Sequence, residues 1–211
     1  MSPLCWDALE PEAREAFTIV SGALSGEDCY LAGGTALALM EGHRVSVDLD
    51  IFTERLSDTE DVLRRLRGHV PELAVTSVSA GTVYVEVLGV QVSVIEYKYP
   101  LLGPTVSSAA GGLQLANRDD IAAMKLSAIA NRGTRKDFVD LWVLLNRHRP
   151  LEEYLGLFEK KFAVRDMGHV VRSLVHFSDA DRDPPLRLLI DIAWEEVKFG
   201  FCRRVRKLLE R

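Results

Sequence analysis

The chain has few cysteines, no long hydrophobic run and no excess of positive charge. Its three cysteines, Cys5, Cys29 and Cys202, are far apart and odd in number. They form neither a metal-spaced pair nor a disulfide framework, so we expect a protein of the reducing cytoplasm. No apolar run is long enough to cross a bilayer, and residues 1–7 lack the basic start and apolar stretch of a signal peptide. We therefore expect no membrane association.

The formal net charge of −5 excludes a global basic field of the kind that attracts nucleic acid. Any contact with RNA would have to come from a local basic patch. A hydrophobic content of 47% over 211 residues is enough for one large domain or two small ones with a real core.

A diglycine turn stands near the middle of the first half of the chain. A short apolar stretch ends at Ala32, and Gly33, Gly34 and Thr35 follow it before a run of helix formers up to Met40. A glycine turn that opens a helix presents free N–H groups and the positive end of the helix dipole, which suits a phosphate. The alternative is a strand–helix turn shaped only for packing.

An alternating pattern follows at residues 45–52 and predicts a strand. Val45, Val47, Leu49 and Ile51 would share one face, and Ser46, Asp48 and Asp50 the other. Two carboxylates two residues apart on a strand point the same way, about 7 Å apart, and repel each other unless a cation lies close. Magnesium prefers a few carboxylates together with substrate phosphates, so we predict that Asp48 and Asp50 bind Mg²⁺. The alternative is a pair of surface acids at the end of a strand.

Gly33-Gly34-Thr35 followed by Asp48-x-Asp50 resembles the signature of the polymerase-β-like nucleotidyltransferases. The longer strings at residues 31–39 and 42–52 resemble, more narrowly, the AbiEii/AbiGii-type nucleotidyltransferases, which are toxins of bacterial abortive-infection and toxin–antitoxin pairs. This resemblance implies a magnesium-dependent transfer of a nucleotide from an NTP to an acceptor, such as RNA or a protein, and a cognate antitoxin as a partner. It also implies that the diglycine turn holds the triphosphate and that Asp48 and Asp50 are catalytic.

Two further residues lie beside this motif. Ser46 shares the strand face of the acids and is predicted to support them and the bound nucleotide. Arg44 stands just before the strand, where it either reaches a phosphate or is a solvated turn residue. The sequence leaves these two interpretations of Arg44 open.

A second charged group spans residues 125–141. Lys125 and Arg132 are two helical turns apart and fall on one face. By resemblance, Lys125, Arg132 and Lys136 bind the nucleotide phosphates, and Asp137 is a general base or positions the acceptor. The alternative is a salt-bridged helical hairpin in which Arg132 or Arg135 pairs with Asp137.

The pattern departs from the superfamily at one position. A third carboxylate is commonly found on a later strand, where this chain has Ser93. Glu96 is three residues farther on and would lie on the opposite face of a regular strand, so it could serve only through a bulge or bend. A nucleotide-binding regulatory module that has lost its chemistry is therefore an alternative to an enzyme, and an unrelated α+β binding protein is a third.

The remaining patterns predict an α+β fold, with a mixed β-sheet nucleotidyltransferase core flanked by helices and a mostly helical C-terminal part. We expect a helix at residues 57–67, capped by Ser57 with Glu60 three residues on. The expected domains are residues 1–105 and residues 106–211, of which the second completes the nucleotide cleft. The other strands are expected at residues 29–32, 73–78, 82–88 and 90–97. The other helices are expected at residues 11–21, 35–41, 117–131, 135–146, 151–161 and 167–175, with one or two final helices from residue 184 to about 211.

Overall fold

A computed structural model describes residues 3–56, 58–70, 73–108 and 112–210. The chain forms two compact units. Unit 1 consists of Met1–Pro100 and Pro104–Asn117, and unit 2 of Leu101–Gly103 and Arg118–Arg211. The contacts thus group residues 106–117 with unit 1, whereas the sequence interpretation placed its division at residues 105/106. The α+β class is confirmed, because unit 1 contains a mixed sheet and unit 2 is helical.

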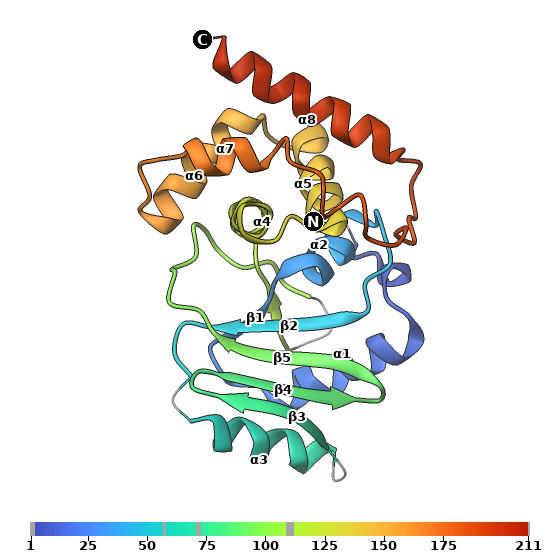
Figure 1. Ribbon diagram of the computed structural model, residues 1–211. Helices are drawn as coiled ribbons and strands as arrows, with labels where there is room; N and C mark the ends of the chain where they lie inside the picture. The colour runs from blue at the N-terminus through green and yellow to red at the C-terminus, as the bar shows by residue number, and fades with distance from the viewer. Residues whose placement is uncertain (1–2, 57, 71–72, 109–111, 211) are drawn as a thin grey trace. The chain divides into compact units, whose positions relative to one another are not determined.

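Unit 1 is built on a sheet whose described strands run in the order β3-β4-β5-β2-β1-β6 (Figure 1). β2 is parallel to β5 and β1 is parallel to β6, while the other neighbours are antiparallel. Val83, Val85, Val92 and Val94 in the two central hairpin strands are buried, as alternating apolar residues should be. The strands are β1 (Cys29–Leu31), β2 (Asp48–Thr53), β3 (Ala74–Ser79), β4 (Thr82–Val87), β5 (Val90–Glu96) and β6 (Gln114–Leu115).

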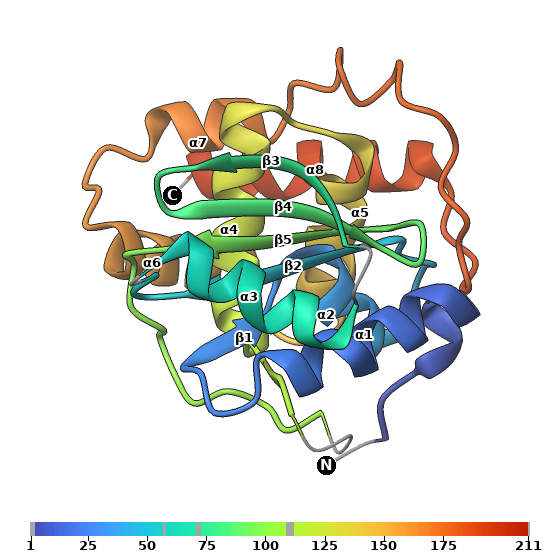
Figure 2. The same ribbon diagram turned by 90° about the horizontal axis from the view of Figure 1, so that it is seen from below.

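The helices of unit 1 are η1 (Trp6–Ala8), α1 (Pro11–Ala23), α2 (Gly33–Glu41) and α3 (Thr59–His69). Figure 2 shows α1 and α3 lying together over one face of the sheet. Ala13, Phe17 and Val20 of α1 are buried there, which confirms the apolar face expected for this helix. α2 packs against β2 and begins at the diglycine turn.

Two expectations for unit 1 were wrong in detail, and one short strand was missed. β2 begins at Asp48, and Val47 is 66% exposed, because the backbone N–H of Ser46 instead donates to Ala8 in a separate bridge. β6 was not predicted, since two residues carry no periodicity. Asp58 caps α3 by accepting from the Glu60 N–H, and Ser57, the predicted cap, lies outside the described residues.

Unit 2 contains α4 (Arg118–Asn131), α5 (Arg135–Arg147), α6 (Leu151–Phe162), α7 (Gly168–Ser173) and α8 (Trp194–Leu209). Phe138 on α5 is fully buried and contacts the rings of Phe177, Trp194 and Phe201. α5 and α8 approach closely, since a Cβ added at Gly200 would lie 2.0 Å from the Trp142 ring. The final helix begins only at Trp194, so the expectation of helix from residue 184 onward was wrong for residues 184–193.

A buried ion pair joins two helices of unit 2. Lys161 Nζ on α6 lies 2.6 Å from Asp120 Oδ1 on α4, and both side chains are fully inaccessible to solvent. The Leu102 N–H donates to both oxygens of Asp120, which compensates the carboxylate further. In the described parts of both units, no helix has the length and apolar character needed to cross a membrane.

Candidate active site

The diglycine turn and the second acid of β2 lie side by side in unit 1. Gly33 has φ of +65°, a left-handed conformation that favours glycine, and a Cβ added there would lie 3.4 Å from Asp50 Oδ2. The Ala32 N–H donates to the Asp50 carbonyl at 3.0 Å, which ties the end of β1 to β2. The sequence therefore folds so that a carboxylate stands against the start of α2.

The first turn of α2 is suited to an anion. An α-helix leaves its first N–H groups without intrahelical acceptors, and the residue at the N-cap position, Ala32, has no side-chain acceptor for them. Gly33 and Gly34 place no side chain over these donors, and Thr35 follows as the third helical residue. The start of α2 therefore has the free N–H groups and the lack of side chains from which a phosphate-binding turn was predicted.

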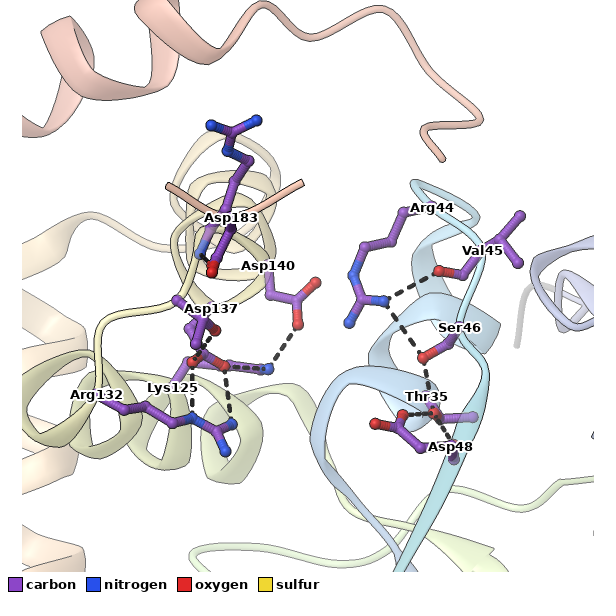
Figure 3. Close-up of polar contacts among 12 residues, drawn as sticks. Thr35, Arg44, Val45, Ser46, Asp48, Lys125, Arg132, Asp137, Asp140 and Asp183 are labelled. Carbon is purple, nitrogen blue, oxygen red and sulfur yellow. Dashed lines mark hydrogen bonds and ion pairs between the residues drawn. The ribbon is translucent and has the colours of Figure 1, made fainter. Parts of the chain in front are cut away.

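Asp48 is held by a hydroxyl relay that comes from α2 and the segment before β2 (Figure 3). Thr35 Oγ1 contacts the Asp48 carbonyl closely and lies 3.3 Å from Asp48 Oδ1. The Ser46 hydroxyl lies 2.8 Å from the Thr35 hydroxyl, and Arg44 Nη1 donates to Ser46 at 3.3 Å. Thr35 and Ser46 are both almost completely buried. Their hydroxyl groups therefore hold Asp48 in a fixed orientation.

Arg44 is buried, with only 4% of its surface exposed. Its guanidinium also donates to the Val45 carbonyl at 3.1 Å. The interpretation of Arg44 as a solvated turn residue is therefore wrong. Its role toward a phosphate stays a prediction, and the described contacts show a residue that braces the chain entering β2.

Ser93 occupies the place where the superfamily commonly has a third acid. The register pairs Asp50 with Ser93 on adjacent parallel strands, and Ser93 Oγ donates to Asp50 Oδ1 at 2.6 Å. The register continues unbroken to Thr53 opposite Glu96. Glu96 therefore lies on the other face from Ser93, and no bulge occurs in the described β2–β5 pairing that would bring it round.

Unit 2 holds a second pair of acidic residues, and both form ion pairs with a lysine of the same unit (Figure 3). Lys125 Nζ on α4 lies 2.8 Å from Asp137 Oδ1 and 2.6 Å from Asp140 Oδ2 on α5. Both aspartates are fully buried, and the Lys125 side chain is 4% exposed. Such charges are stable in the interior only because they are paired.

Arg132 and Thr134 complete this cluster. Arg132 Nε donates to Asp137 Oδ2 at 3.1 Å, and Thr134 Oγ1 donates to the same oxygen at 2.7 Å. Burial alone would raise the pKa of Asp137, but the charges of Lys125 and Arg132 outweigh it and lower the pKa to about 2. The structure thus brings together three of the predicted residues of this group, Lys125, Arg132 and Asp137.

The remaining predicted residue, Lys136, precedes Asp137 on α5 and is half-buried. Two residues that the sequence interpretation did not assign also hold site carboxylates, namely Ser93 and Thr134. Thr134 is the N-cap residue of α5 but makes no side-chain cap hydrogen bond. Its three-residue spacing from Asp137 was visible in the sequence. The hydrogen bond from Ser93 depends on strand register, which no local pattern reveals.

The described residues contain no group of three or more His, Cys, Asp or Glu side chains that could hold a metal ion. Asp48 and Asp50 still share one face of β2, where both are half-buried. Two carboxylates fit magnesium when phosphate oxygens and water supply the remaining positions. The chemistry of this pair is therefore compatible with a metal that is bound together with a nucleotide.

The family described as nucleotidyl transferase AbiEii toxin, type IV toxin–antitoxin system, matches residues 18–198. The chain belongs to this family. The resemblance noted in the sequence is confirmed, and the matched range contains every residue of both acidic clusters. Membership in the AbiEii family supports a nucleotidyltransferase of the toxin–antitoxin type.

Individual relatives are similar to this chain over most of its length. An uncharacterized protein of Aquifex aeolicus (strain VF5) is 38% identical over 205 residues, covering 96% of this chain and 98% of its own. JHP933 from Helicobacter pylori has a similar fold, with a TM-score of 0.59 and 18% identity over 93% of this chain and 90% of that one. MenT4, the nucleotidyltransferase toxin Rv2826c of Mycobacterium tuberculosis, has a TM-score of 0.54 and 17% identity, over 91% of this chain and 82% of that one. These last two likenesses show the fold.

Proposed function

We propose that this AbiEii-family protein is a magnesium-dependent nucleotidyltransferase that moves a nucleotide from an NTP to an acceptor, and that a cognate antitoxin restrains it. The observation that carries the proposal is the position of the Asp50 carboxylate beside the diglycine turn, where it would lie 3.4 Å from a Cβ added at Gly33. A phosphate held by the first turn of α2 would stand beside a half-buried carboxylate, where a divalent cation is needed to offset the combined negative charge.

Asp48 and Asp50 would hold the magnesium ion. Their carboxylates share a strand face and are half-buried, so they combine fixed positions with access to a ligand. A magnesium ion held there would supply positive charge to offset the negative charge that develops on the phosphates during nucleotidyl transfer.

The chain's own groups do the positioning. The N–H groups of Gly33, Gly34 and Thr35 bind phosphate oxygens. Thr35 and Ser46, braced by Arg44, fix the carboxylate of Asp48. Fixed ligands lower the reorganisation needed at the moment of transfer, which is how such sites accelerate reactions with little covalent chemistry of their own.

Ser93 replaces a third acid with a hydroxyl that donates to Asp50. The donated hydrogen bond fixes the orientation of the Asp50 carboxylate. We therefore propose an active centre with two acids, in which the hydroxyl orients one of them.

In unit 2, Arg132 is the residue best placed to bind phosphate. Its side chain is 58% exposed while it pairs with Asp137, and a guanidinium carries several donors in a fixed fork. Lys136 remains in the proposed phosphate-binding set, whereas Lys125, whose ammonium group is buried against Asp137 and Asp140, is proposed to hold this cluster together. Asp137, with a pKa of about 2, is a weak proton acceptor at neutral pH, so we assign it to positioning Lys125 and Arg132 rather than to general-base catalysis.

The test is incubation of the protein with labelled NTPs, magnesium and total RNA or protein extract, comparing the wild type with Asp48→Ala. Asp28→Ala is the matched control, because Asp28 is an exposed aspartate of unit 1 outside the cluster. Transferred label that disappears in Asp48→Ala and persists in Asp28→Ala is the expected result. Magnesium-dependent NTP binding without transfer would instead favour the regulatory module, and absence of NTP binding would refute both.

A further inference from the structure

A cavity of about 520 Å³ in unit 2 is lined mainly by cationic side chains. Five arginines and lysines line it, together with a single glutamate, although the whole chain has a net charge of −5. They come from the end of α5, the start of α6 and the C-terminal half of α8. The charged lining residues are Arg147, Arg149, Arg203, Arg204, Lys207 and Glu152.

Two of the lining cations are held by other side chains, and the first is Arg149, which pairs with Asp119 and Glu153. The Arg204 guanidinium lies 4.5 Å above the centre of the Trp142 ring, and its Nη2 donates to Asn146 Oδ1 at 2.7 Å. Burial lowers the pKa of Arg204, and the charge of the neighbouring Arg203 lowers it further. Burial and the adjacent charge both disfavour the charged form of Arg204, which a bound anion would favour.

α8 adds an exposed aromatic ring beside these charges. Phe199 is 70% exposed, and Arg203 and Lys207 follow it at four-residue intervals on an α-helix, so the three share a face. A large apolar ring on a basic helix face is the combination on which bases of single-stranded nucleic acid stack while cations bind the phosphates. An acidic protein segment would use the charges but has no need of the ring.

We propose that this cavity and the Phe199–Arg203–Lys207 face of α8 bind single-stranded nucleic acid. The cavity volume suits a nucleotide-sized group, and the helix face extends the contact to neighbouring phosphates and a base. Resting on the proposed nucleotidyl transfer, this strand is the acceptor. Because the chain as a whole is acidic, any contact with RNA needs a local basic patch, and this site is such a patch.

The first experiment measures binding of a fluorescently labelled single-stranded oligoribonucleotide by anisotropy over a range of salt concentrations. The variant is Arg203→Glu/Lys207→Glu, and the matched control is Lys160→Glu/Arg165→Glu, which makes the same charge change at exposed positions outside the cavity. Thermal unfolding of both variants checks that each is folded. We expect at least about tenfold weaker binding and a salt slope reduced by about 1.4 in the first variant only, because two phosphate contacts are lost.

The second experiment tests the ring. Phe199→Ala should weaken oligoribonucleotide binding about tenfold, since one stacked base is worth roughly 1–3 kcal/mol, and should leave binding of inorganic polyphosphate unchanged. A deoxyribonucleotide of the same sequence is the arm that separates RNA from DNA. Binding of either strand with this variant pattern supports the inference.

Three results would overturn it. These are no nucleic-acid binding by the wild type at low salt, equal loss in the two charge-reversal variants, and polyglutamate binding at this face in place of nucleic acid. The assay contains a chelator and no NTP, so its outcome does not depend on catalysis. If the wild type transferred no label, the proposed function would be refuted, but these binding results would still hold.

Discussion

The two acidic pairs of this protein are built from the same side chain but lie in different environments. Asp48 and Asp50 in unit 1 are half-buried and receive hydrogen bonds from the hydroxyls of Thr35 and Ser93. Asp137 and Asp140 in unit 2 are fully buried and contact an ammonium group. A paired and buried carboxylate chiefly maintains the fold, whereas a positioned carboxylate with access to a ligand is available for chemistry.

The largest expected effect is at Asp50, where a substitution should greatly reduce activity but leave stability almost unchanged. Asp50→Asn should reduce nucleotidyl transfer at least about a thousandfold, because a metal ligand worth several kcal/mol is lost. The midpoint of thermal unfolding should stay close to that of the wild type, since Asp50 is half-buried. Labelled-NTP transfer and thermal unfolding measure the two quantities, and an inactive variant that was also largely unfolded would contradict the comparison.

The reverse pattern is expected at Lys125. Lys125→Met should lower the free energy of unfolding by about 3–5 kcal/mol, because it leaves Asp137 and Asp140 buried beside an apolar side chain. Urea unfolding measures this change. The triple variant Lys125→Met/Asp137→Asn/Asp140→Asn is the control and should recover most of the loss; if it does not, packing rather than charge explains the effect.

Acid should weaken unit 2 through Asp137. Its pKa is lowered from 3.8 to about 2 on folding, so its stabilising contribution is complete above the unfolded pKa and is lost as the pH falls through the folded one. The difference in unfolding free energy between the wild type and Asp137→Asn should therefore shrink by about 2 kcal/mol between about pH 5 and pH 2. Chemical unfolding at several pH values measures it, and a constant difference would exclude the linkage.

A glycine substitution tests the contact between the turn and Asp50. Gly33→Ala should cost about 1–2 kcal/mol of stability, because it places a Cβ in a left-handed conformation. That Cβ would also meet Asp50 Oδ2 and should impair NTP binding, measured by calorimetry. Gly68→Ala is the control, since a Cβ there meets open space, and unimpaired NTP binding by Gly33→Ala would argue against the cradle.

The smallest expected effect is at Ser93. Ser93→Ala should lower stability by about 1 kcal/mol, the worth of one hydrogen bond. Transfer should fall by less than tenfold, because Asp50 itself remains. The companion variant Ser93→Asp places a third carboxylate beside Asp50 and should strengthen the dependence of transfer on magnesium, which a magnesium titration measures. An unchanged magnesium dependence would mean that this strand position does not face the metal.

Much of the fold was predictable because its signals are local. The alternation at Leu49, Asp50 and Ile51 has the burial pattern expected of a strand with one polar face. Gly81 and Gly89, both in left-handed conformations, mark the hairpin turns that the sequence indicated. The helices α1, α4, α5 and α6 follow their apolar spacing to within two residues at each end.

The errors arose where a distant partner decides the outcome. Val47 fits the apolar alternation, yet it is exposed because the residue before it is paired with Ala8. For residues 125–141 the sequence offered a salt-bridged helical hairpin as an alternative, and Arg132 does pair with Asp137. Spacing along one helix could not show that Lys125 is enclosed between Asp137 and Asp140. Burial of a charge is a property of tertiary packing and leaves no periodic trace in the sequence.

The pairing of β1 with β6 has a consequence for the order in which the molecule is made. Tyr30 lies opposite Gln114, and Leu31 accepts a hydrogen bond from Ala116, across more than eighty intervening residues. A nascent chain that has reached only Pro100 therefore holds β1 with one side unprotected, open to association with other polypeptides. β6, the last described strand of the sheet, is translated just before α4. The sheet is therefore completed at nearly the same time as synthesis of the helices of unit 2 begins.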